Sequence, residues 1–414
     1  MLKKVLSLLL ALVLVVGACF TLASCDKTPD SDFKVGFIFL HDENSTYDLN
    51  FINAANAAKT ALGLSDDQVI FKKNIPESEA CYTAAAELVD EGCDVIFADS
   101  FGHEPYIIQA AQEFTDVQFC HATGTKAHTE GLDNYHNAFA SIYEGRYLAG
   151  VAAGMKLKEM IDAGKFTAAE AKIGYVGAYT YAEVISGYTS FYLGAKSVVP
   201  EVTMEVQFTG SWYDEPKEKE AANVLINNGC KLISQHADSM GAPKACEEKG
   251  IPNVSYNGST VSACPNTFIV SSAINWAPYM EYMIKSVKEG KSIDKDWTGT
   301  IATGSVVLSD INTTAAAAGT KEAIEAAKAG LADGSIHVFD VSKFTVTVTD
   351  NKNVNATVDA DGHLTSYMAD VDTDANYTAD TEAVSNGYFH ESEKRSAPYF
   401  DIQIDGIKLL NSAF

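Results

Sequence analysis

The chain contains the stretch Glu87-Leu-Val-Asp-Glu-Gly-Cys-Asp-Val-Ile-Phe-Ala-Asp-Ser100 and repeats its pattern, with one insertion, as Leu225-Ile-Asn-Asn-Gly-Cys-Lys-Leu-Ile-Ser-Gln-His-Ala-Asp-Ser239. In each copy a helical pattern ends at a glycine, a β-strand follows, and an Asp-Ser pair comes at the carboxyl end of that strand. Glycine is favoured at such helix ends because it adopts positive φ without strain. The repeat therefore predicts two similar α/β halves.

Strand and helix patterns alternate on both sides of these two copies, from Phe33 to about Phe268. The first half opens on Lys34-Val-Gly-Phe-Ile38, and Lys172-Ile-Gly-Tyr-Val176 opens the second half in the same pattern. Strands that alternate with helices of this length indicate parallel βαβ units. Because open parallel sheets bind ligands at the carboxyl ends of their strands, we expect an α/β fold of two Rossmann-like lobes with a ligand cleft between them.

The alternation also predicts where the lobes begin and end. Beyond Asp340 the alternation of strand and helix patterns ends. In Lys343-Phe-Thr-Val-Thr-Val-Thr-Asp350, apolar and polar residues alternate as in a β-strand. The expected units are a first lobe at 33–142 with about 269–300 crossing back to it, a second lobe at 143–268 with about 301–340, and a β-rich C-terminal extension at 341–414 that lies outside the duplication.

The amino terminus has the pattern of an export signal. Lys3 and Lys4 precede an apolar run that is short for a membrane span, which favours a cleaved signal. The run leads to Leu22-Ala23-Ser24-Cys25, which resembles the bacterial lipoprotein signal. That resemblance implies removal of 1–24, lipidation of Cys25 and a tether over 25–32, on the outer face of a cell membrane. An ordinary secretory signal with an incidental Cys25 is one alternative, and Cys19, after Val16-Gly17-Ala18, is a poorer second candidate for the lipidated cysteine.

Charge and residue spacing limit which ligands and partners are expected. The formal net charge of −25 at pH 7 repels phosphate backbones, so nucleic acid is not an expected partner. The cysteines beyond Cys25 form no Cys-x-x-Cys pair, and the nine histidines show no metal-ligand spacing. We therefore expect a monomer with no metal, no cofactor and no essential disulfide.

Four phrases, in this order and spacing, carry a family resemblance: Tyr143-Glu-Gly-Arg-Tyr-Leu-Ala-Gly150, Gly210-Ser-Trp-Tyr-Asp214, Lys219-Glu-Ala-Ala222 and Ala237-Asp-Ser239. Together with the duplicated lobes they resemble the basic membrane protein (PnrA-like) family of substrate-binding lipoproteins of ABC transporters, over about residues 33–340. The resemblance implies a type I periplasmic-binding-protein-like fold. It also implies an extracytoplasmic protein that delivers a small solute, such as a purine nucleoside or purine base, to an ABC permease.

The sequence departs from the family pattern at the expected ligand contacts. Trp212 stands where the family has a phenylalanine that stacks on the base, and Tyr256-Asn257 replaces a Val-Asp pair that contacts ribose. Ser272-Ala-Ile-Asn275 lacks the lysine of the family's Ser-x-x-Lys, and Asp48-Leu49-Asn50 replaces an early Ser-Phe-Asn. The chain therefore resembles a divergent branch, for which a free purine or another flat heterocycle is expected beside nucleosides.

A small polar heterocycle needs flat apolar faces and a few well-aimed hydrogen-bonding groups. In the second lobe the candidates are Trp212 as a face, Asp238 as an acceptor, and Asn257 and Asn275 as donors and acceptors. In the first lobe, residues that follow strands supply the candidates: Tyr47, Asp48, Asn50, Ser100, Phe101 and His121. The alternatives are core positions for the aromatic rings, helix or turn caps for the carboxyl and amide groups, and a structural role for the histidine. For Trp276, packing at the hinge and contact with the ligand are equally consistent with the sequence.

Two other classes of function are an enzyme and a signalling receptor. An enzyme would need catalytic residues, but the chain has no Gly-x-Ser-x-Gly elbow, no P-loop and no His-Glu-x-x-His motif. A nucleoside hydrolase would need an aspartate cluster that holds a metal, and Asp42 with Glu43 does not make one. We therefore expect no catalytic residues. A receptor that reports its ligand to a membrane signalling system stays open, because it would recognise the ligand in the same way.

Overall fold

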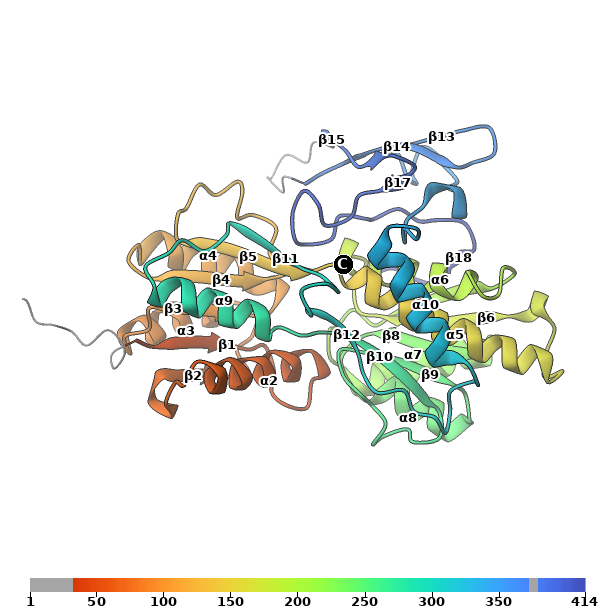
Figure 1. Ribbon diagram of the computed structural model, residues 1–414, viewed down its shortest axis with the longest axis horizontal. Helices are drawn as coiled ribbons and strands as arrows, with labels where there is room; N and C mark the ends of the chain where they lie inside the picture. Colours follow the sequence, from red (N-terminus) through yellow and green to blue (C-terminus); the bar gives the residue numbers. More distant parts are fainter. Residues whose placement is uncertain (1–32, 372–378, 414) are drawn as a thin grey trace, which may run out of the picture.

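A computed structural model describes residues 33–371 and 379–413 of the chain. They form two α/β lobes that lie side by side, with β-rich chain packed above the second lobe (Figure 1). The predicted signal, Cys25 and the tether lie outside the described residues. No helix in the described ranges is both long and apolar enough to cross a bilayer. The cysteines of these ranges are buried free thiols: Cys81, Cys93, Cys120, Cys230, Cys246 and Cys264.

The first lobe is built on a parallel sheet of six strands in the order β11-β5-β4-β3-β1-β2. Its strands are β1 (Val35–Ile38), β2 (Val69–Lys72), β3 (Val95–Ala98), β4 (Gln118–Ala122), β5 (Tyr135–Ala140) and β11 (Asp296–Gly299). One face is covered by α2 (Thr46–Ala61) and α9 (Ala277–Lys288), and the other by α3 (Glu79–Asp90) and α4 (Glu104–Glu113). The central strands β1 and β3 are apolar throughout, because both faces of the sheet are buried there.

The second lobe has a seven-stranded sheet in the order β12-β10-β9-β8-β6-β7-β18, in which only the β10–β12 pair is antiparallel. Its strands are β6 (Lys172–Gly177), β7 (Thr203–Phe208), β8 (Leu232–His236), β9 (Asn253–Tyr256), β10 (Phe268–Ile274), β12 (Val306–Leu308) and β18 (Ile407–Leu409). The helices are α5 (Ile142–Asp162), α6 (Ala182–Lys196) and α10 (Thr320–Asp333) on one face, and α7 (Glu215–Asn227) and α8 (Gly241–Lys249) on the other.

The two sheets confirm the predicted α/β duplication. Strands β5-β4-β3-β1-β2 of the first lobe have the same spatial order as β10-β9-β8-β6-β7 of the second. The repeated Asp-Ser pairs follow the corresponding strands β3 and β8, so Asp99 and Asp238 occupy equivalent strand ends. Short 3₁₀ turns lie between the main elements: η1 (Asp66–Gln68), η2 (Phe101–His103), η3 (Ala168–Glu170) and η4 (Val341–Lys343).

Three chain segments connect the lobes: Ser141 after β5, residues 275–276 after β10, and residues 300–305 after β11. They are bonded to one another, because Ser141 N donates to Gly299 O at 2.8 Å and Asn275 N donates to Ser305 O at 2.7 Å. The return to the first lobe, expected at about 269, begins after Ile274. Strand β10 stays in the second sheet because it pairs there with both β9 and β12.

Small residues let α5 and α6 cross in close contact behind the second sheet. A Cβ atom on Gly150 would lie 2.1 Å from Phe191 O, and one on Gly194 would lie 2.1 Å from Tyr147 O. Each helix therefore needs a glycine where it meets the backbone of the other. This contact holds α5, the helix that follows the first connecting segment at Ser141, against α6 of the second lobe.

The C-terminal extension contains the small antiparallel strands β13 (Ala356–Val358), β14 (Leu364–Ala369), β15 (Thr381–Glu382), β16 (Val384–Ser385) and β17 (Tyr388–Phe389). It is less separate than the sequence predicted. Phe400 stacks on Phe339 at 4.2 Å within the core of the second lobe, and β18 joins the edge of that lobe's sheet beside β7. It also reaches the first lobe, where Ser396 N donates to Asp296 Oδ1 at 3.0 Å.

A buried carboxyl, Glu391, attaches the extension to α6. Its oxygens accept hydrogen bonds of 2.5 Å from Ser186 Oγ and Ser392 Oγ. Burial raises the pKa of Glu391 from 4.5 to about 7, so the folded protein binds this proton more tightly than the unfolded chain does. The stabilisation from this proton is therefore complete below about pH 4.5 and is lost as the pH rises toward about 7.

We expect Glu391→Gln to remove this part of the pH dependence, because glutamine keeps the hydrogen bonds and does not titrate. Between pH 5 and pH 8 the wild type should lose about 1–3 kcal/mol more unfolding free energy than the variant, as measured by denaturant titration. The control is Glu393→Gln, whose side chain is 54% exposed and should leave the slope unchanged. Equal pH slopes for Glu391→Gln and the wild type would contradict the assignment.

Candidate functional site

A cavity lies between the lobes, where the carboxyl ends of the two sheets face each other. It is formed by side chains that follow strands or begin helices in both lobes. The lining residues are Leu40, His41, Tyr47, Asp48, Ser100, Phe101 and Thr123 from the first lobe, and Glu183, Trp212, His236, Asp238 and Asn257 from the second.

The turn between β1 and α2 positions an ionised carboxylate on the first-lobe side. Ser45 caps α2 by accepting a hydrogen bond from Asp48 N, which fixes the first turn of the helix. Asp48 Oδ1 accepts from His41 N at 2.7 Å, and Asp48 Oδ2 lies 3.3 Å from His41 Nδ1. Burial acts to raise the pKa of Asp48, but hydrogen bonds from His41 and Ser45 outweigh it and hold the pKa below its ordinary value. Asp48 is therefore a charged acceptor at neutral pH.

Aromatic rings of the first lobe are fixed by contacts to the end of β3. The hydroxyl of Tyr47 donates to Asp99 O at 2.7 Å. The neighbouring Ser100 Oγ donates to Glu77 Oε1 at 2.6 Å, which holds the chain just before Phe101. Tyr47 and Phe101 thus reach the cavity from fixed backbone and offer flat apolar faces.

The second lobe contributes Trp212 and a group of buried polar side chains. Trp212 is half-buried and lies edge-on to Tyr179, with ring centroids 5.0 Å apart. His236 Nε2 lies 3.3 Å from Glu183 Oε1, and burial lowers the pKa of His236, which keeps the imidazole neutral. A neutral imidazole carries one donor and one acceptor nitrogen.

The pKa of Asp238 is shifted in the opposite direction from that of Asp48. Burial, followed by the charges of Glu218 and Asp48, raises the pKa of Asp238 well above its ordinary value. Asn257 Nδ2 donates to Asp238 Oδ1 at 3.3 Å, and Asn257 itself adopts φ 63°, which turns the chain at the end of β9. The cavity therefore has a carboxyl group from each lobe, Asp48 from the first and Asp238 from the second.

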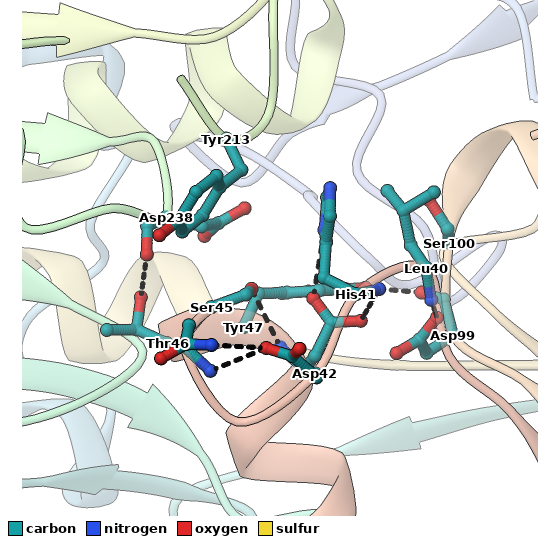
Figure 2. Close-up of polar contacts among 12 residues, drawn as sticks. Leu40, His41, Asp42, Ser45, Thr46, Tyr47, Asp99, Ser100, Tyr213 and Asp238 are labelled. Carbon is teal, nitrogen blue, oxygen red and sulfur yellow. Dashed lines mark hydrogen bonds and ion pairs between the residues drawn. The ribbon is translucent and has the colours of Figure 1, made fainter. Parts of the chain in front are cut away.

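The lobes touch each other around the cavity. Thr46 N and Thr46 Oγ1 both donate to Asp238 O, at 3.1 and 3.2 Å (Figure 2). The ring of Tyr213 from the second lobe lies beside the ring of His41 from the first, with centroids 5.4 Å apart. The enclosed space is about 20 Å³, room for roughly one water molecule. This arrangement is a closed one, with the side chains of the two lobes filling most of the cleft.

Seven of the ten residues predicted for ligand binding line this one cavity: Tyr47, Asp48, Ser100, Phe101, Trp212, Asp238 and Asn257. The other three lie elsewhere. His121 is fully buried under the site, where Nε2 lies 2.6 Å from Ser100 O. Asn275 is exposed at the hinge, where Nδ2 donates to Gly304 O at 3.1 Å and Oδ1 accepts from Ala277 N. Asn50 lies on α2, one turn beyond Thr46, and does not contribute to the lining.

Sequence reasoning missed five lining residues: Leu40, His41, Thr123, Glu183 and His236. The duplication contained a signal for one of them, because α6 follows β6 as α2 follows β1, so Glu183 near the start of α6 corresponds to the Tyr47-Asp48 region. His236 ends β8 two residues before the predicted Asp238. Thr123 follows His121 by two positions and adopts φ 62°, which no strand pattern indicates.

The chemistry of the lining favours a flat ligand that carries N–H donors. Three aromatic rings offer faces for stacking, and the carboxyl, imidazole and amide groups offer acceptors beside a few donors. Within the described part of the chain this lining includes neither lysine nor arginine. A larger groove of about 1060 Å³ lies along α5, β12 and α10, but it is lined mainly by small and aliphatic side chains away from the facing strand ends.

Comparison with known proteins gives a family and a set of relatives. The model of a family described as "ABC transporter substrate-binding protein PnrA-like" matches residues 65–313. A purine-binding protein of Brucella abortus is 32% identical over 264 residues, which are 63% of this chain and 70% of that protein. A putative ABC transporter glucose-binding protein of Haloferax volcanii is 34% identical over 207 residues, which are 50% of this chain and 49% of that protein.

Solved structures show the same fold. An ABC transporter solute-binding protein of Aeropyrum pernix superposes with a TM-score of 0.63 at 17% identity, over 77% of this chain and 94% of that one. An ABC transporter solute-binding protein of Conexibacter woesei superposes with a TM-score of 0.59 at 19% identity, over 74% of this chain and 98% of that one. This chain therefore shares its two-lobed fold with both of these proteins.

Proposed function

The chain belongs to the PnrA-like family of ABC transporter substrate-binding proteins, and from this premise we propose that it captures a purine base or purine nucleoside outside the cytoplasm and delivers it to the permease of an ABC importer. The observation that carries the proposal is the single cavity that Trp212 of one lobe lines together with Tyr47 and Asp48 of the other. The purine-binding relative supports the same ligand class.

The lining matches the groups that a purine presents. A purine has two flat faces for Trp212 and Tyr47, and stacking of a base on an aromatic side chain is worth about 1–3 kcal/mol. Its N–H groups donate to the carboxyl oxygens of Asp48 and Asp238, and its ring nitrogens accept from the amide of Asn257. The recognition draws on both lobes, so binding is complete only when both lobes close on the ligand. Because the space between them in this structure is about 20 Å³, the lobes must stand further apart around a purine than they do here.

Capture works by hinge closure. Opening at the three connecting segments would break the Thr46–Asp238 hydrogen bonds and admit the ligand. A ligand that contacts both lobes stabilises the closed form, because those contacts exist only there. The closed form then presents to the permease a surface that the open form lacks. The protein acts in this scheme as a monomer.

Lipidation at Cys25 would keep the protein at the outer face of the membrane. We expect Cys25→Ser to move the protein from the membrane fraction to the soluble fraction and to abolish labelling by palmitate. Cys19→Ser is the matched control, because it changes a cysteine of the same segment outside the Leu22–Cys25 signal. Retention of labelled Cys25→Ser at the membrane would contradict the anchor.

The ligand class is tested by thermal unfolding of the full chain in detergent against adenine, adenosine, glucose and amino acids. A ligand at ~100 times its Kd adds about 2.7 kcal/mol to stability, a shift that a melt resolves. We expect adenine or adenosine to raise the melting temperature and glucose and amino acids to leave it unchanged. A shift with glucose alone would replace the purine assignment by the sugar that the Haloferax relative is named for.

A further inference from the structure

The cleft continues beyond the first cavity into a second compartment. The two share Phe101, Thr123 and Glu183 as lining residues, so they adjoin. The second compartment has a volume of about 280 Å³, against about 20 Å³ for the first. Three parts of the chain build it, because the C-terminal extension joins the two lobes in its wall.

The extension contributes a buried arginine to this wall. Arg395 is 7% exposed, and two of its nitrogens are engaged, since Nε donates to Ala397 O at 3.2 Å and Nη2 donates to Pro398 O at 3.1 Å. Across residues 33–371 and 379–413, the buried Nη1 has no hydrogen-bond partner. A buried donor without a partner costs free energy, so a ligand group that accepts from Nη1 would recover it.

The extension holds this arginine firmly in place between the lobes. Ser396, the next residue, donates its N–H to Asp296 of the first lobe. Asp401, which also lines the compartment, accepts a hydrogen bond from the hydroxyl of Tyr367. The guanidinium is therefore positioned by contacts of the extension on both sides of Arg395.

The carboxyl groups around Arg395 determine which kind of ligand group the second compartment can bind. Asp370, Asp296 and Glu104 all act on the charge of Arg395, and Glu183 and Asp401 lie in the lining itself. A phosphate would meet these carboxylates as well as the single guanidinium, and like charges repel. Thr123, Thr125 and Tyr181 add hydroxyl groups to the lining. Carboxylates, hydroxyls and one guanidinium together suit a neutral group with several hydroxyls, which both donates and accepts.

We propose that this compartment binds the sugar of a nucleoside whose base lies in the first cavity, with Arg395 Nη1 donating to a sugar oxygen and Glu183 accepting from a hydroxyl. The proposal rests on the purine ligand proposed above and deepens it. The C-terminal extension is then part of the ligand site, and this chain prefers nucleosides to free bases and to nucleotides.

The test compares adenosine, adenine and adenosine 5′-monophosphate by calorimetric titration of the full chain in detergent. Arg395→Met keeps the aliphatic stem and removes the donors, and it should weaken adenosine about tenfold while changing adenine less than twofold. Tyr181→Phe, which keeps the ring stacked on Phe101 at 5.1 Å, should weaken adenosine in the same selective way by a smaller factor. The exposed neighbour Lys394→Met is the control and should change neither affinity.

The outcomes separate this proposal from the one on which it rests. If the wild type binds neither adenine nor adenosine, the purine assignment itself is wrong. If it binds both, and both variants leave the ratio of the two affinities unchanged, the sugar compartment is wrong and the purine assignment stands. Binding of the monophosphate more tightly than adenosine would assign Arg395 to a phosphate and overturn the proposal. If Arg395→Met weakens adenine and adenosine alike, and Tyr181→Phe leaves the ratio of the two affinities unchanged, Arg395 has only a structural role and the proposal is overturned.

Discussion

Replacing Trp276 by alanine is expected to lower the free energy of unfolding of the first lobe by about 3–5 kcal/mol, the range for a large aromatic side chain removed from a core. Trp276 is 1% exposed and stacks on Phe51 with ring centroids 4.5 Å apart. Phe97 and Phe139 pack on it at 6.2 and 6.1 Å. The sequence left open whether this tryptophan touches ligand or packs at the hinge. The structure places it in the connecting segment at residues 275–276, with its ring packed in the core of the first lobe.

The measurement is denaturant unfolding followed by circular dichroism. Trp276→Phe serves as the matched variant, because it retains a ring in the stack and should lose much less stability. The half-buried Trp297→Phe gives a reference for an aromatic replacement at the edge of the same lobe. A loss below about 1 kcal/mol for Trp276→Ala would be too small for a core aromatic residue and would contradict this placement.

Replacing Trp212 by alanine is expected to weaken purine binding by about 1–3 kcal/mol, which is roughly 5- to 150-fold, because a stacking face is lost. Trp212 is only half-buried, and it contacts Tyr179, Tyr181 and His236 at the rim of the second lobe. The fold should therefore survive the change. Calorimetric titration with adenine and adenosine measures the loss of affinity, and a melt of the unliganded variant measures the change in stability.

Two variants make this result specific. Trp212→Phe keeps an aromatic face and should retain most of the affinity. Tyr213→Phe changes the neighbouring ring, which faces His41 across the lobes, by a single hydroxyl and should have little effect. Unchanged affinity for Trp212→Ala would remove this side chain from the site, and a collapse of the melting transition would make it a core residue.

The sequence predicted the parts of the fold that depend on local pattern. The duplicated helix-glycine-strand stretch led directly to equivalent strands β3 and β8 in two sheets of the same order. The position of the hinge was harder to predict, because the mostly apolar segment Phe268–Ile274 fits either lobe until its pairing partners are known. Strand β18 has only three residues, and it is a strand because β7 presents an open edge to it.

The sequence predicted those site residues that follow β-strands. Asp48, Trp212 and Asp238 follow strands and converge, as parallel sheets require. His121 lies on β4 itself and is buried against Ser100, whereas Thr123, just beyond the strand, reaches the cavity. Arg395 lies 157 residues beyond Asp238 in a segment without strand or helix pattern, so only the folded extension brings it to the cleft.

The most direct test of the account uses the tryptophans as reporters. The chain has three, and only Trp212 lines the cavity, while Trp276 is buried in the first lobe and Trp297 lies on β11. Titration with adenosine should quench the tryptophan fluorescence of the wild type to saturation, and Trp212→Phe should remove that quenching while it still binds adenosine by calorimetry. Saturable quenching that persists in Trp212→Phe would show that purines do not bind against Trp212 and would contradict the proposed site.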